Sequence, residues 1–310
     1  MKIVFMGTPQ AAVPSLERLI NDGHHVIAVY TQPDRPSGRG NKITFSPVKD
    51  FALSNQLEIH QPTKIKTPEA LETFRSHDAD VAVVVAYGRI LPGTFLNAFP
   101  GGAINVHFSL LPKYRGAAPV NWAIVNGETE TGVTTMEMDA GLDTGAILLQ
   151  KATAIDDTET AVGLMTRLSR IGADLLSETL ADLESIVPEP QDHGLSTLAP
   201  LMKREDGLID WRMSARDISN RVRGFQPFPT AFTYFQEAKL TIWNALAADQ
   251  TVIVGSPGQI VEAHGGDLLV QCGHDSTLKL IEIQPEGKRR MPARDFINGF
   301  RPETGTVLGA

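Results

Sequence analysis

The sequence has little cysteine and no long apolar run. Its single cysteine, Cys272, excludes an internal disulfide and any metal site built on several thiolates, which fits a reducing compartment. The longest apolar runs, such as residues 81–86, are far shorter than the roughly 20 residues that a helix needs to cross a bilayer. Residues 1–7 are too few for the apolar core of a signal peptide. We therefore expect a cytoplasmic protein with no membrane partner.

Two motifs of nucleotide and acyl chemistry are also missing. The first apolar segment ends in Gly7-Thr8-Pro9, but the second and third glycines of the dinucleotide fingerprint G-x-G-x-x-G are absent. Ser109 is followed by Leu-Leu-Pro and not by the x-Gly of a nucleophile elbow. A bound dinucleotide and a covalent acyl-enzyme are therefore both poorly supported.

The charge balance is acidic and uneven. A net charge of −8 argues against a generic nucleic-acid binder. Residues 1–202 carry 15 Lys and Arg against 23 Asp and Glu, whereas residues 203–310 carry 13 of each kind. A polyanion would therefore meet local basic patches in the second part of the chain.

The hydrophobic pattern predicts two domains of different classes. Short apolar strands alternate with amphipathic helices through residues 1–187, which predicts an α/β domain with a Rossmann-like, parallel-sheet core. Residues 188–202 read as a linker without periodicity, rich in Pro and polar residues. Residues 203–310 contain one helix followed by alternating segments joined by turns, which predicts a small OB-like antiparallel β-barrel.

An unusual strand opens the segment 103–119. Ile104 and Val106 share one face of this strand, whereas Asn105 and His107 share the other. Because burying an amide and an imidazole without partners costs a few kcal/mol, we expect both near the carboxyl end of the strand, facing solvent or ligand. Ligands bind at that end of open α/β sheets. The pair predicts a catalytic centre.

Asp143, in the turn-rich loop 139–145, completes a candidate set with Asn105 and His107. An Asp–His pair can fix the imidazole tautomer or make the ring cationic, and an amide can donate to a developing oxyanion. The set suits direct transfer of an acyl-like group between two bound substrates. Structural alternatives stay open, since the three could cap a turn, fill a core and stabilise a loop. His107 has no second His or Glu at ligand spacing, so we expect no metal there.

Residues 33–46 form a polar and locally basic loop. Its composition fits a solvated connection, but unstructured connections of this length are uncommon in compact domains and are often functional. We expect it to be mobile.

Motifs along nearly the whole chain carry a family resemblance. In order, they are residues 5–9, 32–36, 38–40, 84–88, 105–112, 114–119, 132–134, 138–145, 208–211 and 225–229. With them the sequence resembles the methionyl-tRNA formyltransferases, a family of folate-dependent enzymes. The Asn-x-His…Asp set and the Ser-Leu-Leu-Pro turn are typical of folate-dependent formyltransferases generally, and the loop with the second domain narrows the resemblance to those that act on tRNA.

The resemblance implies a reaction and its residues. The formyl group of 10-formyltetrahydrofolate would pass to the amino group of methionine on initiator methionyl-tRNA, without a metal. Asn105 and His107 would stabilise the oxyanion, and Asp143 would orient His107 and help to relay protons. The implied folate-site residues are Ser109, Leu110, Leu111 and Pro112 in the turn, with Tyr87, Gly88 and Ile90 along the pterin.

The resemblance also implies where tRNA binds. The loop would reach the acceptor end, so that Arg39 and Lys42 become contacts to phosphates or bases, although Asn41 stands where the family often has another Lys. In the second domain the candidate contacts are Lys203, Arg204, Arg221, Arg223, Lys288, Arg289, Arg290 and Arg294. Each could instead be a solvated surface charge. We expect a monomer whose tRNA binding depends strongly on salt.

Two other functions stay open at this stage. A folate-dependent formyltransferase that acts on a nucleotide-linked amino sugar or a purine precursor would share the Asn-x-His…Asp set and differ in the loop and the second domain. A noncatalytic RNA-binding protein on a Rossmann-like scaffold would not need that set.

Overall fold

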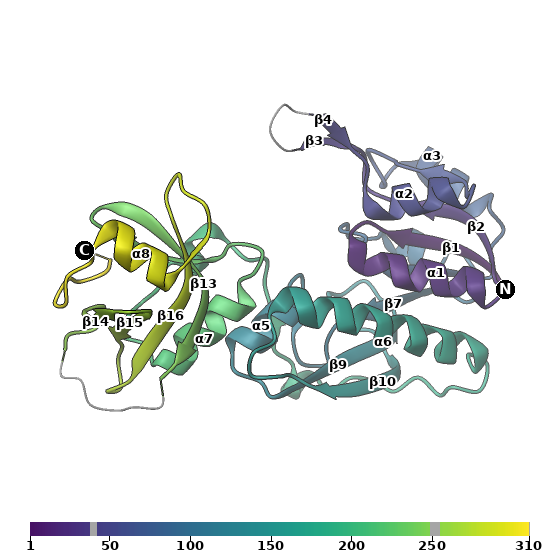
Figure 1. Ribbon diagram of the computed structural model, residues 1–310. Coiled ribbons are helices and arrows are strands. Elements are labelled where there is room, and N and C mark those ends of the chain that lie inside the picture. Colours follow the sequence, from purple (N-terminus) through teal and green to yellow (C-terminus); the bar gives the residue numbers. More distant parts are fainter. Residues whose placement is uncertain (38–41, 249–254, 310) are drawn as a thin grey trace. The chain divides into compact units, whose positions relative to one another are not determined.

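A computed structural model describes residues 1–37, 42–248 and 255–309, and the chain forms two compact units (Figure 1). The first unit comprises Met1–Pro119, Glu130–Ala154 and Met165–Ala199, and the second comprises Val120–Thr129, Ile155–Leu164 and Pro200–Ala310. Most of the expected linker, up to Ala199, is therefore part of the first unit. The division into residues 1–187, 188–202 and 203–310 stays a prediction.

The first unit is built on a seven-stranded sheet with the order β10-β9-β7-β6-β1-β2-β5. Its strands are β1 (Lys2–Gly7), β2 (His25–Tyr30), β5 (Ile59–His60), β6 (Val81–Val85), β7 (Ala103–His107), β9 (Glu130–Glu137) and β10 (Ile147–Ala154). The strands β5, β2, β1, β6 and β7 are parallel to their neighbours in this order. Strand β9 runs antiparallel to β7, and β10 runs antiparallel to β9. The expected α/β fold with a parallel core is confirmed, with an antiparallel extension at one edge.

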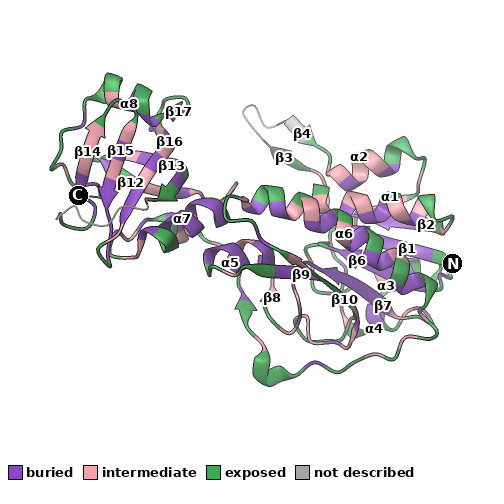
Figure 2. Ribbon diagram, turned by 60° about the horizontal axis from the view of Figure 1, so that its bottom comes forward, coloured by how far each residue is buried: buried purple, intermediate pink, exposed green. Residues whose placement is uncertain are grey.

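Helices flank the sheet, and the buried sides of the longer ones, such as α1 and α6, face it (Figure 2). The helices of this unit are η1 (Gln10–Ala12), α1 (Val13–Asn21), α2 (Pro47–Ser54), α3 (Pro68–Arg75), α4 (Gly93–Leu96), most of α6 (Ala161–Ala181) and η2 (His193–Leu195), whereas nearly all of α5 (Pro119–Val125) belongs to the second unit. Local sequence sets some of the boundaries: α2 begins where the Ser46 side chain accepts a hydrogen bond from the Lys49 amide and Pro47 occupies the first turn. Within the described residues, no helix has the length and apolar character needed to cross a membrane.

Two short strand pairs lie outside this sheet. Strands β3 (Arg35–Ser37) and β4 (Lys42–Thr44) pair antiparallel, so the segment expected as an unstructured loop is in part a two-stranded ribbon. Of its predicted tRNA contacts, Arg39 lies outside the described residues, and only the backbone of Lys42 is described. Strand β8 (Arg115–Gly116) pairs parallel with β11 (Leu198–Ala199).

The second unit contains a six-stranded antiparallel sheet with the order β12-β13-β16-β15-β14 and β17 added to β16. Its elements are η3 (Arg204–Gly207), α7 (Ala215–Gly224), β12 (Ala231–Phe235), β13 (Ala238–Ala247), β14 (Ile260–His264), β15 (Asp267–Gln271), β16 (Thr277–Pro285), β17 (Met291–Pro292) and α8 (Ala293–Phe300). Trp211 and Phe296 belong to its apolar core. The expected small antiparallel domain is confirmed, while its closure into an OB-like barrel stays a prediction.

Candidate active site

The position of β7 inside the sheet explains how Asn105 and His107 become buried. The strand pairs with β6 on one side and β9 on the other, with Asn105 opposite Val84 and Met136. The opposite face is apolar, because Val106 lies so close to Gly172 of α6 that a Cβ there would be 2.9 Å from Val106 Cγ1. With one face closed by α6, Asn105 and His107 point away from that helix, as the alternation predicted.

The hydrogen bonds of His107 define its tautomer. Its Nε2 lies 3.0 Å from the carbonyl oxygen of Tyr114, and since a carbonyl can only accept, Nε2 carries the proton. In the neutral ring Nδ1 then bears the lone pair, and it lies 3.7 Å from Oδ2 of Asp143. Burial lowers the pKa of His107, although Asp143 and the Tyr114 contact act in the opposite direction. His107 is therefore a neutral imidazole near pH 7, with Nδ1 as its basic atom.

Asp143 is held in a strained backbone conformation beside His107. Its φ of 52° lies in the left-handed region, which Asp tolerates better than most residues. Its Oδ2 accepts a hydrogen bond from the amide of Gly116 at 2.8 Å. The carboxylate is thus fixed where it can stabilise a proton that arrives on Nδ1 of His107.

A buried clamp that the sequence did not reveal holds the Asp143 loop. Nε2 of Gln191 donates to the carbonyl oxygens of Asp143 at 3.0 Å and Gly145 at 2.7 Å. Oε1 of Gln191 in turn accepts from Nε and Nη2 of Arg115 at 3.0 and 2.6 Å, and Nη1 of Arg115 lies 3.1 Å from Nδ1 of His193. Gln191 falls in the segment expected to be a linker, and no local pattern indicates its distant partners.

The amide of Asn105 has no hydrogen-bond partner among the described residues, although only 8% of this residue is exposed. The Asn105 amide is not among the fully enclosed polar atoms without a partner, so it still reaches an opening and is free to donate or accept a hydrogen bond there. An unpaired amide on the same strand face as His107 indicates a group that binds a ligand.

The Ser-Leu-Leu-Pro turn after β7 is tied to the sheet. Oγ1 of Thr134 donates to the Ser109 carbonyl at 2.7 Å and accepts from the Leu111 amide at 3.1 Å. Ser109 and Leu111 are buried, as Asn105 and His107 are, and folate contacts at these two positions stay a prediction. Leu110 packs against Gly132, and Leu110 and Pro112 are half-buried. The turn therefore supports the site, and a folate contact through Leu110 or Pro112 stays a prediction.

The implied pterin residues differ in exposure. Tyr87 is a core residue with 2% exposure, so it does not line an open slot, and burial raises the pKa of its hydroxyl. The reason is the turn in which Ala86 and Gly88 adopt φ values of 47° and 82°, while the tyrosine between them points inward. Ile90, in contrast, is 76% exposed. It lines an apolar groove of about 430 Å³ together with Ile65, Leu71, Leu91, Pro92 and Phe95.

A second, more polar recess lies at the carboxyl ends of β1 and β2. It measures about 330 Å³ and is lined by Thr8, Gln32, Pro33, Arg35, Ser46 and Gly88. The strand order reverses at β1, and ligands of open α/β sheets bind at such a switch point. Thr8 and Gln32 both donate to the Tyr87 carbonyl, at 3.0 and 3.1 Å, which fixes this rim.

Arg223 is a buried structural residue and not a surface contact for tRNA. It is 8% exposed, and its Nη1 donates to the carbonyl oxygens of Asp156 at 3.1 Å and Glu159 at 2.8 Å. Its Nη2 donates to Oδ1 of Asn220 at 2.7 Å. Burial lowers the pKa of this guanidinium. The prediction of a phosphate contact at Arg223 is therefore wrong.

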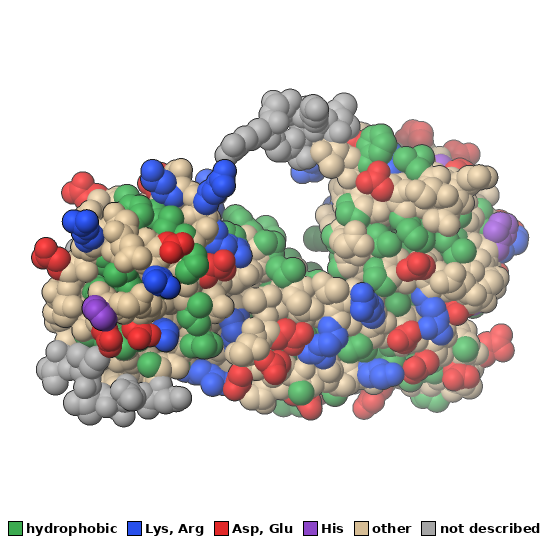
Figure 3. Space-filling view, in the orientation of Figure 1, with side chains coloured by type: hydrophobic (Ala, Val, Ile, Leu, Met, Phe, Trp, Pro, Cys, Tyr) green, Lys and Arg blue, Asp and Glu red, His purple; other side chains and the backbone are tan. Residues whose placement is uncertain are grey.

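The other predicted cations of the second unit differ in how strongly they are already engaged. Arg290 stacks on Trp243 with 3.8 Å between its Cζ and the ring centroid, and it pairs with Glu282 at 3.2 Å. Lys203, Arg204, Lys288 and Arg289 are exposed. Figure 3 shows that basic and acidic side chains are interspersed over the face drawn, so that face carries local basic groups instead of one continuous patch.

Comparisons with known proteins place this chain in a family. A formyl transferase family model matches residues 1–180, and a model for the C-terminal domain of formyl transferases matches residues 201–301. A methionyl-tRNA formyltransferase from Koribacter versatilis is 53% identical over 312 residues, covering 100% of this chain and 99% of the relative. One from Geobacter sulfurreducens is 47% identical over 311 residues and covers 100% and 97%.

Solved structures show the same fold at low identity. A sugar 3N-formyl transferase, WlaRD, solved with dTDP and 5-N-formyl-THF, has a TM-score of 0.68 at 20% identity and covers 93% of this chain and 99% of that one. An N-formyltransferase from Helicobacter canadensis, in complex with folinic acid and dTDP-3-aminofucose, has a TM-score of 0.67 at 19% identity and covers 92% and 99%. Through the full-length relatives and both domain matches, the chain belongs to the methionyl-tRNA formyltransferase family.

Proposed function

We propose that this enzyme transfers the formyl group of 10-formyltetrahydrofolate to the amino group of methionine on initiator methionyl-tRNA by direct attack. The observation that carries the proposal is the unpaired Asn105 amide on the strand face that also bears His107. A site that needs both an oxyanion donor and a proton acceptor has them here on residues two apart.

The proton path follows from the tautomer of His107. The neutral amine attacks the formyl carbon, the Asn105 amide donates to the oxygen that becomes negative, and Nδ1 of His107 takes the proton that the amine loses. The neutral His107 ring has its Nε2 proton bonded to Tyr114, so in this proposal Asn105 takes over the oxyanion role that was expected of both residues. Asp143, 3.7 Å from Nδ1, stabilises the resulting imidazolium. As the bond to N10 breaks, the same proton passes to N10, giving formylmethionyl-tRNA and tetrahydrofolate. No covalent enzyme intermediate and no metal are needed.

The two recesses suit two different substrates. The apolar groove beside Ile90 fits the flat, partly apolar donor, and Gly88 contributes to the more polar recess that includes Thr8, Gln32 and Arg35. We assign the acceptor end to this polar recess, since β3, which begins at Arg35, leads into the ribbon for which tRNA contacts are predicted at Arg39 and Lys42. Donor and acceptor would thus approach the strand ends through separate recesses.

Binding of tRNA by the second unit rests on its free basic groups. Lys203, Arg204, Lys288 and Arg289 are exposed cations suited to phosphate contacts. We further propose that the enzyme acts as a monomer in the cytoplasm, where initiator tRNA is charged.

The test is formyl transfer from 10-formyltetrahydrofolate to charged initiator tRNA, with elongator methionyl-tRNA and a dTDP-linked amino sugar as competing acceptors. The proposal expects transfer to the initiator at a rate well above that to either competitor. Transfer to the amino sugar alone would replace the assignment by a sugar enzyme, and transfer to no acceptor would contradict it.

A further inference from the structure

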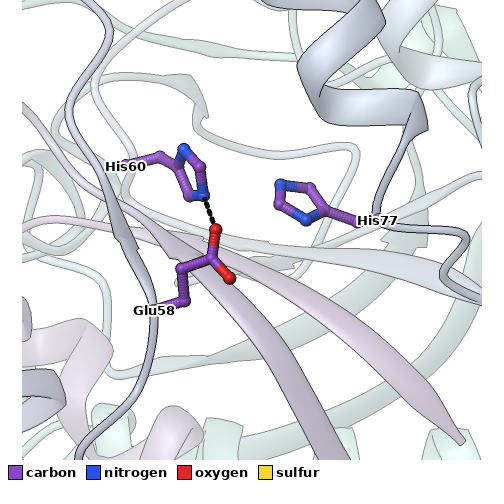
Figure 4. A group of neighbouring side chains, drawn as sticks. All are labelled: Glu58, His60 and His77. Carbon is purple, nitrogen blue, oxygen red and sulfur yellow. Dashed lines mark hydrogen bonds and ion pairs between the residues drawn. The ribbon is translucent and has the colours of Figure 1, made fainter.

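We propose that Glu58, His60 and His77 form a binding site for a divalent transition-metal ion, with Zn²⁺ as the best match. His60 belongs to the edge strand β5, Glu58 immediately precedes that strand, and His77 follows α3. In Figure 4 the carboxylate and the two imidazoles turn toward a common centre. The formyl transfer proposed above uses none of these three residues.

The donor atoms are nearly close enough for one ion. Nε2 of His60 lies 2.6 Å from Oε1 of Glu58, and one donor atom from each of the three residues lies within 4.8 Å of the others. Bond lengths of about 2.0–2.1 Å in a tetrahedral zinc site place neighbouring ligand atoms about 3.3 Å apart. Small side-chain rotations, which lengthen the first contact and shorten the others, would produce that geometry.

Packing already holds both imidazoles in place. The ring of His60 stacks on Tyr30 with centroids 4.8 Å apart and planes 12° from parallel. Nε2 of His77 lies 2.9 Å from the hydroxyl of Tyr30. Two imidazoles that are oriented before an ion arrives lose little conformational freedom on binding.

The group is open to solvent. The Glu58 side chain is 60% exposed and that of His60 is 23% exposed, so an ion can reach the group from solvent.

The donor set selects the class of ion. Two imidazoles and one carboxylate match the ligands that zinc prefers, with water in the fourth position. Ca²⁺ and Mg²⁺ require six or more oxygen ligands and would bind poorly here. A bound ion would tie the edge strand β5 to the segment after α3, and so stabilise the first unit.

Titration calorimetry of the untagged, chelator-treated protein with ZnCl₂ tests the site, and Co²⁺ provides a visible spectrum of its geometry. We expect one Zn²⁺ per chain, the intense bands of tetrahedral Co²⁺, and their loss on adding Zn²⁺. At a hundredfold excess over the dissociation constant, Zn²⁺ should raise the melting temperature by about 5 °C. Mg²⁺ should do neither.

Variants assign the ligands. His60→Gln and His77→Gln should each weaken Zn²⁺ binding by tenfold or more and abolish the Co²⁺ bands. Glu58→Gln changes an exposed side chain, so it keeps the metal-free melting temperature and still weakens binding even if a histidine variant misfolds.

The matched control is His24→Gln. His24 Nδ1 lies 3.4 Å from the N-terminal amine, so these two groups could compete for the ion, and binding should not change in this variant. Absence of binding, or equal binding by the wild type and Glu58→Gln, would overturn the proposal.

Discussion

Asn105 on β7 and Arg223 on α7 are equally buried, each with 8% of its surface exposed, but they are engaged differently. Both Nη atoms of Arg223 donate, to two carbonyl oxygens and to the Asn220 side chain, and only its enclosed Nε has no partner. Asn105 donates to no described residue. Burial alone therefore does not distinguish a functional polar residue from a structural one, whereas its hydrogen-bond partners do.

The physical reason lies in the cost of unpaired polar groups. A buried cation whose donors meet carbonyl oxygens joins two segments, here residues 156–159 and α7, and removing it leaves those acceptors unpaired. An unpaired amide that reaches an opening keeps a donor free for a ligand that can accept from it. The first arrangement stabilises the fold, and the second favours binding of an oxyanion.

The largest effect on the transfer rate is expected for a change beside Asn105, at His107. His107→Ala removes the atom that accepts the amine proton, so the transfer rate should fall by about 10³-fold. Affinity for tRNA should stay within twofold, because the buried His107 side chain is bonded to the Tyr114 carbonyl oxygen and makes no proposed contact to tRNA. Single-turnover transfer and filter binding measure the two quantities. An unchanged rate would show that His107, like Arg223, is only a structural residue.

Asp143→Asn separates charge from position. The amide still accepts from Gly116, but it cannot stabilise an imidazolium, so the rate should fall by about 10²-fold.

The pH dependence of the transfer rate gives a second test of Asp143. The rate falls at acid pH as His107 becomes protonated, and burial places this acid limb of the pH–rate profile below the ordinary histidine pKa of 6.5. Because Asp143 raises the pKa of His107, its loss should move the acid limb to still lower pH. A limb that stays in place or moves to higher pH would contradict this electrostatic role.

Gln191→Glu tests whether the clamp is a positioning device. A carboxylate can still accept from Arg115, but it cannot donate to the carbonyl oxygens of Asp143 and Gly145. We expect a loss of about 1–3 kcal/mol of stability, because the two buried carbonyl oxygens lose their donor. In the folded protein kcat should be about tenfold lower, with little change in KM for tRNA. Glu189→Gln, on an exposed side chain of the same segment, is the control. If both variants keep full activity, the clamp only holds the chain together.

The fold and the central pair could be predicted because their signals are local. Alternation along residues 103–108 was enough to put Asn105 and His107 on one face, and periodicity indicated most helices and strands of both units, although α8 (Ala293–Phe300) was not predicted. Asp143 entered through its turn-rich loop and the family resemblance, without which it would have remained a plausible loop-stabilising residue.

The missed features depend on long-range contacts. Gln191 sits between prolines and polar residues, and nothing near it indicates a partner 46–76 residues away. Arg223 looks like a surface cation on an amphipathic helix, because the carbonyl oxygens that it binds come from the distant segment around Asp156. The burial of the Tyr87 side chain was not predicted, because the positive φ of Ala86 is not visible in the residue type.

The smallest effect is expected for exposed cations. Replacing Lys288 and Arg289 together by Ala should weaken tRNA binding several-fold and lower the slope of log K against log salt by about one for each phosphate that is no longer neutralised. Turnover at saturating tRNA should not change. Replacing Arg290, already held by Trp243 and Glu282, should change that slope less. An equal or larger change for Arg290 would reverse this ranking.

The different roles of Asn105 and Arg223 are tested most directly by measuring the free energy of unfolding and the transfer rate for Asn105→Ala and Arg223→Ala side by side. Asn105→Ala should slow transfer by about 10²–10³-fold and change stability by less than about 1 kcal/mol. Arg223→Ala should cost about 3 kcal/mol of stability and leave the transfer rate of the folded protein within about threefold. Loss of stability with full activity in Asn105→Ala would contradict the account.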